Sequence, residues 1–215
     1  MEITVKQMMQ IENNGHQMGF LKKFMMENAG AAAVKNLIKK FNDISNKSII
    51  IFAGLGNNGG DALVMARHLS GYGVTVTVVL LGDPEKIKTE ESQWNWKLLE
   101  KMQSVKLMTG TNSNFDFMPD IIIDGILGTG ISGEIREPYA SAINFINNSK
   151  AFKLAVDVPS GLDPDTGKTA NIFVKADVTI TFHKMKIGMS KRKDLCGEIF
   201  VEKIGIPPEA EKGVL

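Results

Sequence analysis

SIIIFAGLGNNGGDALVMARHL, residues 48–69, has the clearest structural pattern in the chain. It opens with a run of branched apolar residues over 48–53, which is typical of a buried strand. Four of the next seven residues, 54–60, are glycines, and apolar residues then recur at helical spacing over 61–72. The stretch therefore predicts a strand, a glycine-rich loop and a helix in that order.

The same alternation continues along the chain. The apolar run 74–81 is typical of a central parallel strand covered on both faces. Further strands are predicted at 105–108, 121–124, 153–157, 177–182 and 198–203, and helices after Thr4, over 21–41, 89–103 and 138–147. Strands alternating with helices predict an α/β protein: a three-layer Rossmann-like fold whose mostly parallel sheet carries helices on both faces.

Length and composition indicate one ordinary globular domain, residues 1–215, with 209–215 as a polar tail that we expect to be mobile. Lys and Arg number 25 against 24 Asp and Glu, so the net charge of +1 favours neither a nucleic-acid partner nor a membrane surface. A single cysteine and a polar N-terminal segment lead us to expect a cytoplasmic protein.

Four loops follow predicted strands: 54–61, 124–134, 157–161 and 182–188. In open parallel sheets, ligands bind beyond the carboxyl ends of the strands. These loops are therefore where the sequence indicates chemistry.

The first loop carries G-x-G-x-x-G at Gly54, Gly56 and Gly59, in the position where a dinucleotide fingerprint stands. The same spacing recurs at Gly128, Gly130 and Gly133, so the pattern fits turn glycines of positive φ equally well. A phosphate-binding loop of the Walker type is excluded, because Asp61 stands where its lysine is required. Taken alone, Asp61 is interpreted as a capping residue in the first turn of the following helix.

Oxygen-bearing side chains also gather at this sheet edge. Asn58, Asp124 and Ser160 bring an amide, a carboxylate and a hydroxyl together, a set that suits a hard cation of low charge better than zinc. Asp157 ends a predicted strand, where a carboxylate can be partly desolvated for acid/base work or can simply cap the turn. The residues themselves leave both interpretations open.

Five stretches together resemble one known family, the NAD(P)HX epimerase family, whose domain is also called the YjeF N-terminal domain. They are MENAG (26–30), GNNGGDALVMARHL (56–69), DGILGTGISGEIREP (124–138), AVDVPSGLDPDTG (155–167) and TFHKMKIG (181–188). Each is moderately specific, whereas their order and spacing are highly specific. The resemblance covers nearly the whole chain.

The resemblance implies an isomerase that interconverts the R and S forms of NADHX and NADPHX, the hydrated nicotinamide nucleotides. It implies one potassium ion per subunit, held by Asn58, Asp124 and Ser160. Asp157 is then the candidate acid/base group, with Lys186 to orient it or a water, although this chain lacks the prolines that often flank that lysine in the family. The implied substrate contacts are Asn57, Asn58, Gly59, Gly60, Asp61, Gly128, Thr129, Gly130, Ile131, Ser132, Gly133, Glu134 and Asp157.

Two other functions are compatible with the predicted fold. A scaffold or non-catalytic nucleotide-binding domain of the same fold has no need of Asn58, Asp124, Asp157 and Ser160. A dehydrogenase would need a separate substrate domain, for which 215 residues leave little room. We expect a homodimer, with Trp94 or Trp96 at its interface because two residues that are two apart cannot share a helix face. We also expect dehydration of the S form to need a kinase-like dehydratase domain, and the sequence leaves open whether a separate chain carries it.

Overall fold

The computed structural model describes residues 1–110, 115–130 and 133–215, and its central feature is a parallel sheet of seven strands. The strand order is β4 (Val105–Thr109), β3 (Thr75–Leu80), β2 (Ser48–Ala53), β5 (Ile121–Gly125), β6 (Phe152–Val156), β7 (Val178–Phe182) and β9 (Glu198–Glu202). The chain runs outward from β2 to β4 and then returns to the other side of β2 with β5. The switch point, where ligands bind in such sheets, thus lies between β2 and β5.

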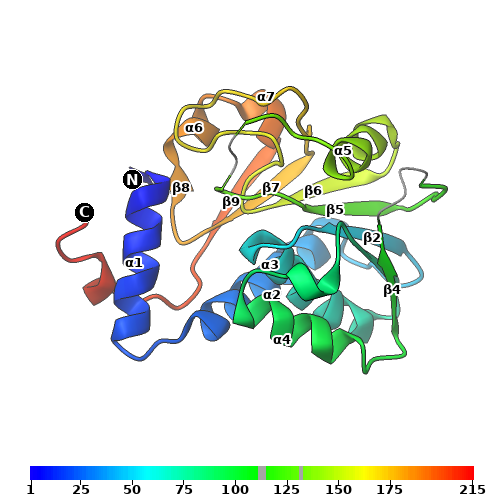
Figure 1. Ribbon diagram of the computed structural model, residues 1–215, viewed down its shortest axis with the longest axis horizontal. Helices are drawn as coiled ribbons and strands as arrows, with labels where there is room; N and C mark the ends of the chain where they lie inside the picture. The colour runs from blue at the N-terminus through cyan, green and yellow to red at the C-terminus, as the bar shows by residue number, and fades with distance from the viewer. Residues whose placement is uncertain (111–114, 131–132) are drawn as a thin grey trace.

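Helices cover both faces of the sheet (Figure 1). α2 (Lys22–Phe41), α3 (Asn57–Leu69) and α4 (Glu90–Leu99) lie on one face, and α5 (Tyr139–Asn148) lies on the other. The alternation of side chains along β2 explains its apolar sequence: Ile49 and Ile51 join the core under α2 to α4, and Ile50 and Phe52 join the core under α5. The predicted three-layer fold is confirmed.

Several short elements lie beyond the main sheet. α1 (Val5–Gln17) begins at Thr4, which forms a capping box with Gln7. β1 (Glu2–Ile3) pairs in parallel with β8 (Met185–Lys186), and α6 (Ile187–Ser190) and α7 (Lys193–Cys196) follow. Short 3₁₀ helices lie at Ser70–Tyr72, Pro84–Lys86 and Pro208–Glu211. The β1–β8 pair was not predicted, because two-residue strands carry no periodic pattern.

The start of α3 and the last residues of the chain bear on two of the sequence predictions. α3 begins at Asn57 with Gly56 as its N-cap, so Asp61 lies in the second turn and the capping interpretation is wrong. Residues 209–215 lie against α1, where Asn14 Nδ2 donates to Ala210 O at 2.9 Å and Gln7 Nε2 donates to Val214 O at 3.3 Å. Their mobility in solution stays a prediction. Among the described helices, none is long and apolar enough to cross a bilayer.

Candidate functional site

The glycines after β2 allow two loops to meet backbone to backbone. A Cβ on Gly54 would lie 1.9 Å from Ile126 O, and a Cβ on Gly59 would lie 1.9 Å from Gly54 O. Neither glycine has a positive φ, so the turn interpretation is wrong for this loop. Glycine is required here for close approach of backbone, which brings the loop after β5 against the N-terminus of α3.

Asn58, Asp124 and Ser160 do come together, in a buried cluster beside that contact. Ser160 Oγ donates to Asp124 Oδ1 at 2.6 Å, and Ser160 N donates to Asp124 Oδ2 at 2.8 Å. Leu127 links the third member, because its carbonyl accepts from Asn58 Nδ2 at 3.2 Å and its N–H donates to Ser160 Oγ at 2.9 Å. The three predicted side chains therefore form one hydrogen-bonded cluster at the switch point.

The cluster contains a buried carboxylate and an amide oxygen but no cationic side chain among its three members. Asp124 is 1% exposed, and burial raises the pKa of its carboxyl to about 6, although hydrogen bonds from Ser160 and Ile126 oppose the shift. Asn58 Oδ1 is buried, and among the residues that the structure describes it has no hydrogen-bond partner. A buried, unpaired amide oxygen beside a buried carboxylate is an arrangement that a hard cation of low charge would satisfy.

Asp157 and Lys186 form the second polar centre of the site. Lys186 lies in β8 with its side chain 1% exposed, and its Nζ donates to Asp157 Oδ1, to Thr181 Oγ1 at 2.9 Å and to Phe182 O at 3.2 Å. Asp157 Oδ1 also accepts from Thr181 Oγ1 at 2.9 Å. Within the described part of the chain, every hydrogen bond to this carboxylate falls on Oδ1, so Oδ2 accepts none there.

The backbone at Asp157 is unusual. Its φ is +61°, and Val158 N donates to Val156 O at 2.7 Å across it, which is a γ-turn. A positive φ is costly for a residue other than glycine, and such strain concentrates at functional sites. The turn directs the Asp157 side chain across the end of β7 toward Lys186.

Two further carboxylates lie near this pair. Burial raises the pKa of Asp61 well above its usual value, and the nearby Asp157 and Glu12 carboxylates raise it further. Burial likewise raises the pKa of Glu12 on α1, with Asp157 adding to the shift and Lys186 opposing it. Sequence reasoning missed Glu12 and Thr181, because neither stands in a loop that follows a strand. The site thus gathers three acids around one buried ammonium group.

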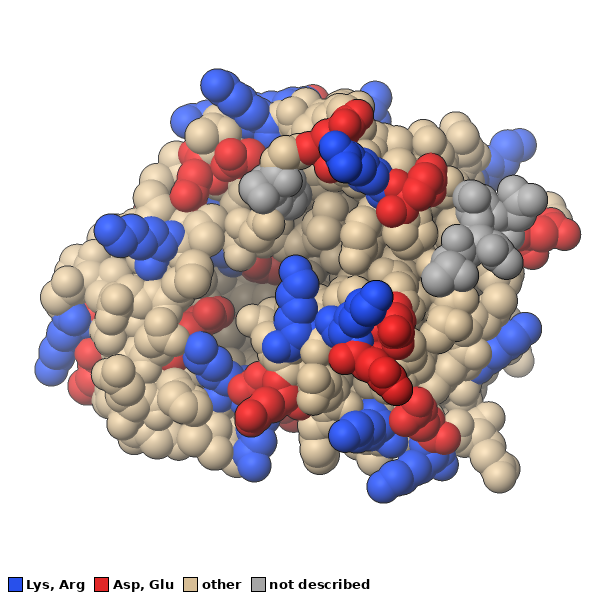
Figure 2. Space-filling view, viewed as in Figure 1, with Lys and Arg blue, Asp and Glu red and all other residues tan. Residues whose placement is uncertain are grey.

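The loop after β5 is only partly brought into the site. A Cβ on Gly128 would lie 3.2 Å from Asn58 Cβ, so this glycine packs on the cluster formed by Asn58, Asp124 and Ser160. Glu134 is exposed, with Oε2 3.7 Å from Arg136 Nε. Thr129 is half-buried, whereas Asn57, Gly130 and Gly133 are exposed. Ile131 and Ser132 lie outside the described residues. Figure 2 shows this face of the molecule hollowed near its centre, with acidic side chains visible in the hollow.

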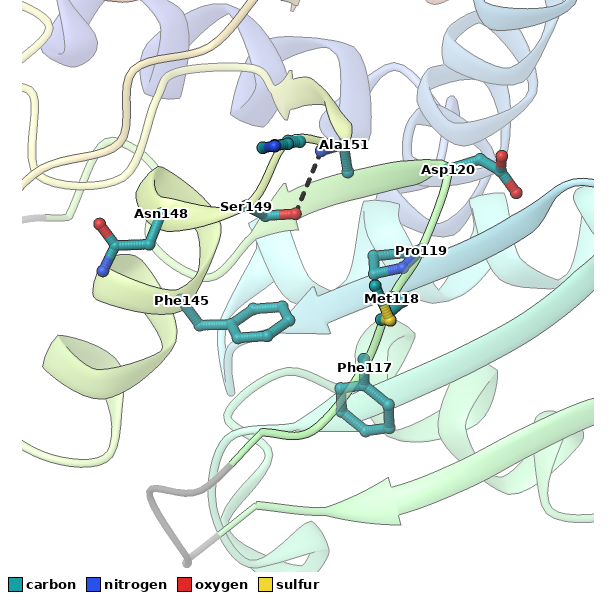
Figure 3. A pocket seen from close by; sticks show the side chains of 9 residues that line it. Phe117, Met118, Pro119, Asp120, Phe145, Asn148, Ser149 and Ala151 are labelled. Atoms are coloured by element: carbon teal, nitrogen blue, oxygen red, sulfur yellow. Dashed lines mark hydrogen bonds between the residues drawn. The ribbon is translucent and has the colours of Figure 1, made fainter.

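A separate pocket of about 590 Å³ lies between Phe117 and Phe145, lined also by Ser149 and Ala151 (Figure 3). It adjoins Asp120 and Ala151, which directly precede β5 and β6, so it lies at the amino ends of these strands. The polar centres described above lie at the carboxyl ends. This pocket is therefore distinct from the candidate site.

Comparison with known proteins gives consistent results. Residues 22–188 match the family described as YjeF-related protein N-terminus. The chain is 74% identical over 215 residues to a protein of Nitrosopumilus maritimus named NAD(P)H-hydrate epimerase, with all of both chains covered. It is 43% identical over 204 residues to the "Bifunctional NAD(P)H-hydrate repair enzyme Nnr" of Hyperthermus butylicus, covering 94% of this chain and 38% of that protein.

A solved structure, that of yeast ynu0 (YNL200c), has the same fold. It superposes with a TM-score of 0.82 at 24% identity, covering 98% of this chain and 91% of the yeast chain.

Proposed function

The chain belongs to the family of YjeF-related N-terminal domains, and we propose that it is an NAD(P)H-hydrate epimerase. The observation that carries this proposal is the 74% identity, over the whole of both chains, to a protein of that name. The substrates are then the R and S forms of hydrated NADH and NADPH, and the reaction is an isomerisation that needs no redox cofactor because the nicotinamide is the substrate.

Epimerisation needs a group that gives a proton to the hydroxyl oxygen on the hydrated carbon and takes one back. That carbon adjoins the ring nitrogen, whose lone pair can expel the hydroxyl group if an acid protonates the leaving oxygen. Water then returns on the other face, or the ring opens and recloses with the opposite configuration. We assign the proton transfer to Asp157, because its Oδ1 accepts the hydrogen bonds from Lys186 and Thr181 whereas its Oδ2 accepts none from the described residues. Lys186 fixes the orientation of this carboxylate through Oδ1.

The rest of the substrate is assigned to the glycine-rich edge. The N-terminus of α3 presents backbone N–H groups and a positive dipole end, which suits the pyrophosphate of a dinucleotide. We place the substrate between residues 57–61 on α3 and residues 128–134 after β5, with Asp157 at the reacting end. Figure 2 shows a hollow on the face of the molecule that carries these loops.

We propose that Asn58, Asp124 and Ser160 hold one potassium ion per subunit. The unpaired Asn58 Oδ1 and the buried Asp124 carboxylate fit a monovalent cation. When bound, the ion would supply positive charge that offsets Asp124 beside the substrate phosphates. Ser160 and Leu127 hold the Asp124 and Asn58 side chains in place.

Three wider assignments belong to the same proposal. The 57% exposed Trp94 on α4 supports a homodimer interface at that helix, whereas Trp96 is buried. The lone cysteine, buried Cys196, is in keeping with the cytoplasm. Dehydration of the S form is assigned to a dehydratase domain and not to this domain.

The direct test is incubation of the purified protein with enriched R-NADHX, with the epimer ratio followed by chromatography. We expect the S form to accumulate faster than in a sample without protein. Equal rates in the two samples would refute the proposed activity.

A further inference from the structure

The turn between β7 and β8 is strained in the same way as the turn at Asp157. His183 has a φ of +65°, and Lys184 N donates to Phe182 O at 2.8 Å across it, so it too is the centre of a γ-turn. This residue is not a glycine, and its side chain is buried, with 2% of it exposed. A conformation of this kind persists only where surrounding contacts enforce it.

Those contacts come from two segments that follow in the chain. In the first, β9 and the residue after it, Glu202 O accepts from His183 N at 2.7 Å and Lys203 Nζ donates to His183 O at 3.3 Å. From the second, Glu211 places Oε1 2.9 Å from His183 Nε2 and 3.0 Å from Lys184 Nζ. Glu211 thus forms an ion pair with Lys184, and its carboxylate lies against the His183 ring, whose Nε2 has no hydrogen bond among the residues that the structure describes.

Glu211 is itself anchored. It ends the 3₁₀ helix Pro208–Glu211, which is tied to α1 through the hydrogen bond from Asn14 Nδ2 to Ala210 O. On the far side of the turn, Ile3 of β1 pairs with Lys186 of β8. The short strand that carries Lys186 is therefore paired with β1 at both of its residues, and the His183 turn fixes its start.

We propose that Glu211 is a positioning residue for the reaction: it holds the His183 turn, and the turn places the Lys186 ammonium group against Asp157. This inference rests on the proposed function, in which Asp157 and Lys186 act on the substrate. Glu211 itself makes no contact with the substrate in this account. Its effect passes through His183 and Lys184 to the catalytic pair.

The test compares Glu211→Ala with Glu209→Ala, an exposed acid on the same 3₁₀ helix. We expect E211A to lower kcat by about tenfold with little change in KM, because a small displacement of Lys186 misplaces the acid/base group without removing binding contacts. E209A should match the unmutated protein. E211Q, which keeps an acceptor oxygen at the same reach, should recover part of kcat.

A double variant separates positioning from general stabilisation. Glycine adopts a positive φ without strain, so in the background His183→Gly the turn depends less on Glu211, although the ion pair with Lys184 remains. We expect the kcat ratio caused by E211A to shrink toward one in that background, with melting temperatures recorded for all variants. An unchanged kcat in E211A, or an equal loss in both backgrounds, would overturn the proposal. If the unmutated protein does not epimerise NADHX, the proposed function has failed instead.

Discussion

Asp157 is the residue on which the proposed chemistry depends most. The change Asp157→Asn keeps the shape and the hydrogen bonds that Oδ1 accepts, but it removes the carboxyl group to which we assign the proton transfer. We expect epimerisation to slow by more than about tenfold, as loss of a positioned acid/base group does. Turnover of R-NADHX, measured at equal folded fraction, checks this. The exposed Asp43→Asn is the matched control, and undiminished turnover in D157N would remove Asp157 from the mechanism.

Asp124 supplies the one full negative charge of the proposed ion site. In Asp124→Ala we expect weaker substrate binding and no response of that affinity to potassium. Affinity measured in potassium chloride and in tetramethylammonium chloride of equal ionic strength checks this, because both salts screen charge alike but only potassium fits the site. A D124A protein whose affinity still rises with potassium as in the unmutated protein would show that the site is misplaced.

Asp61 makes the fold sensitive to pH. Burial raises its pKa above the usual value of 3.8, so the folded state disfavours the ionised form, and the cost appears as pH rises above about 4. Asp61→Asn removes that cost. We therefore expect the melting temperature of D61N to exceed that of the unmutated protein at pH 8, with the gain vanishing near pH 4. An equal gain at both pH values would contradict this origin.

At the residue scale, the sequence predicts the polar atoms that follow strands. Asn58, Asp124 and Ser160 could be expected together because parallel strands end at one edge. Glu12 could not, since nothing in a polar helical stretch indicates which side chain turns inward. The contact of Asp157 with Lys186 also depends on two γ-turns at non-glycine residues, for which the sequence carries no signal.

At the scale of elements, the close approach between α3 and the loop after β2 is the decisive feature. In Gly59→Ala the added Cβ would meet Gly54 O at 1.9 Å, so the helix must shift away from the loop. Overpacking of this kind costs about 1–3 kcal/mol, and we expect the melting temperature to fall by at least about 3 °C. Gly71→Ala, whose Cβ would meet open space, is the matched control. Equal melting temperatures would show that the contact is not tight.

The order of the main strands and helices could be predicted because each has an apolar pattern of the right period. The start of α3 could not, because residues 57–60 have low helix propensity and are held in the helix by packing. Gly59 packs closely against Gly54, and a Cβ on Gly60 would lie 2.2 Å from Ser92 Oγ. These close contacts, and not helix propensity, keep the segment helical. The β1–β8 pair and the packing of residues 208–215 on α1 arise from tertiary contacts that no local pattern encodes.

For the molecule as a whole, the account assigns epimerisation without dehydration. A dehydration driven by phosphoryl transfer needs a site for a nucleoside triphosphate, and the glycine-rich loop of this chain, residues 54–61, contains no phosphate-binding lysine. With R-NADHX, magnesium and either ADP or ATP, we expect the S form to appear with no lasting rise in NADH absorbance. A sustained, nucleotide-dependent rise with homogeneous protein would contradict this division of work.

The central claim is that the site around Asp157 equilibrates the two epimers, and approach to equilibrium from both sides tests it most directly. Separate samples of purified R-NADHX and S-NADHX are incubated with the protein, and the epimer ratio is followed by chromatography to its end point. The account predicts one final ratio from both starting forms, reached faster than in samples without protein and far more slowly with D157N. Samples that keep their starting ratios, or that reach the common ratio no faster than without protein, would contradict it.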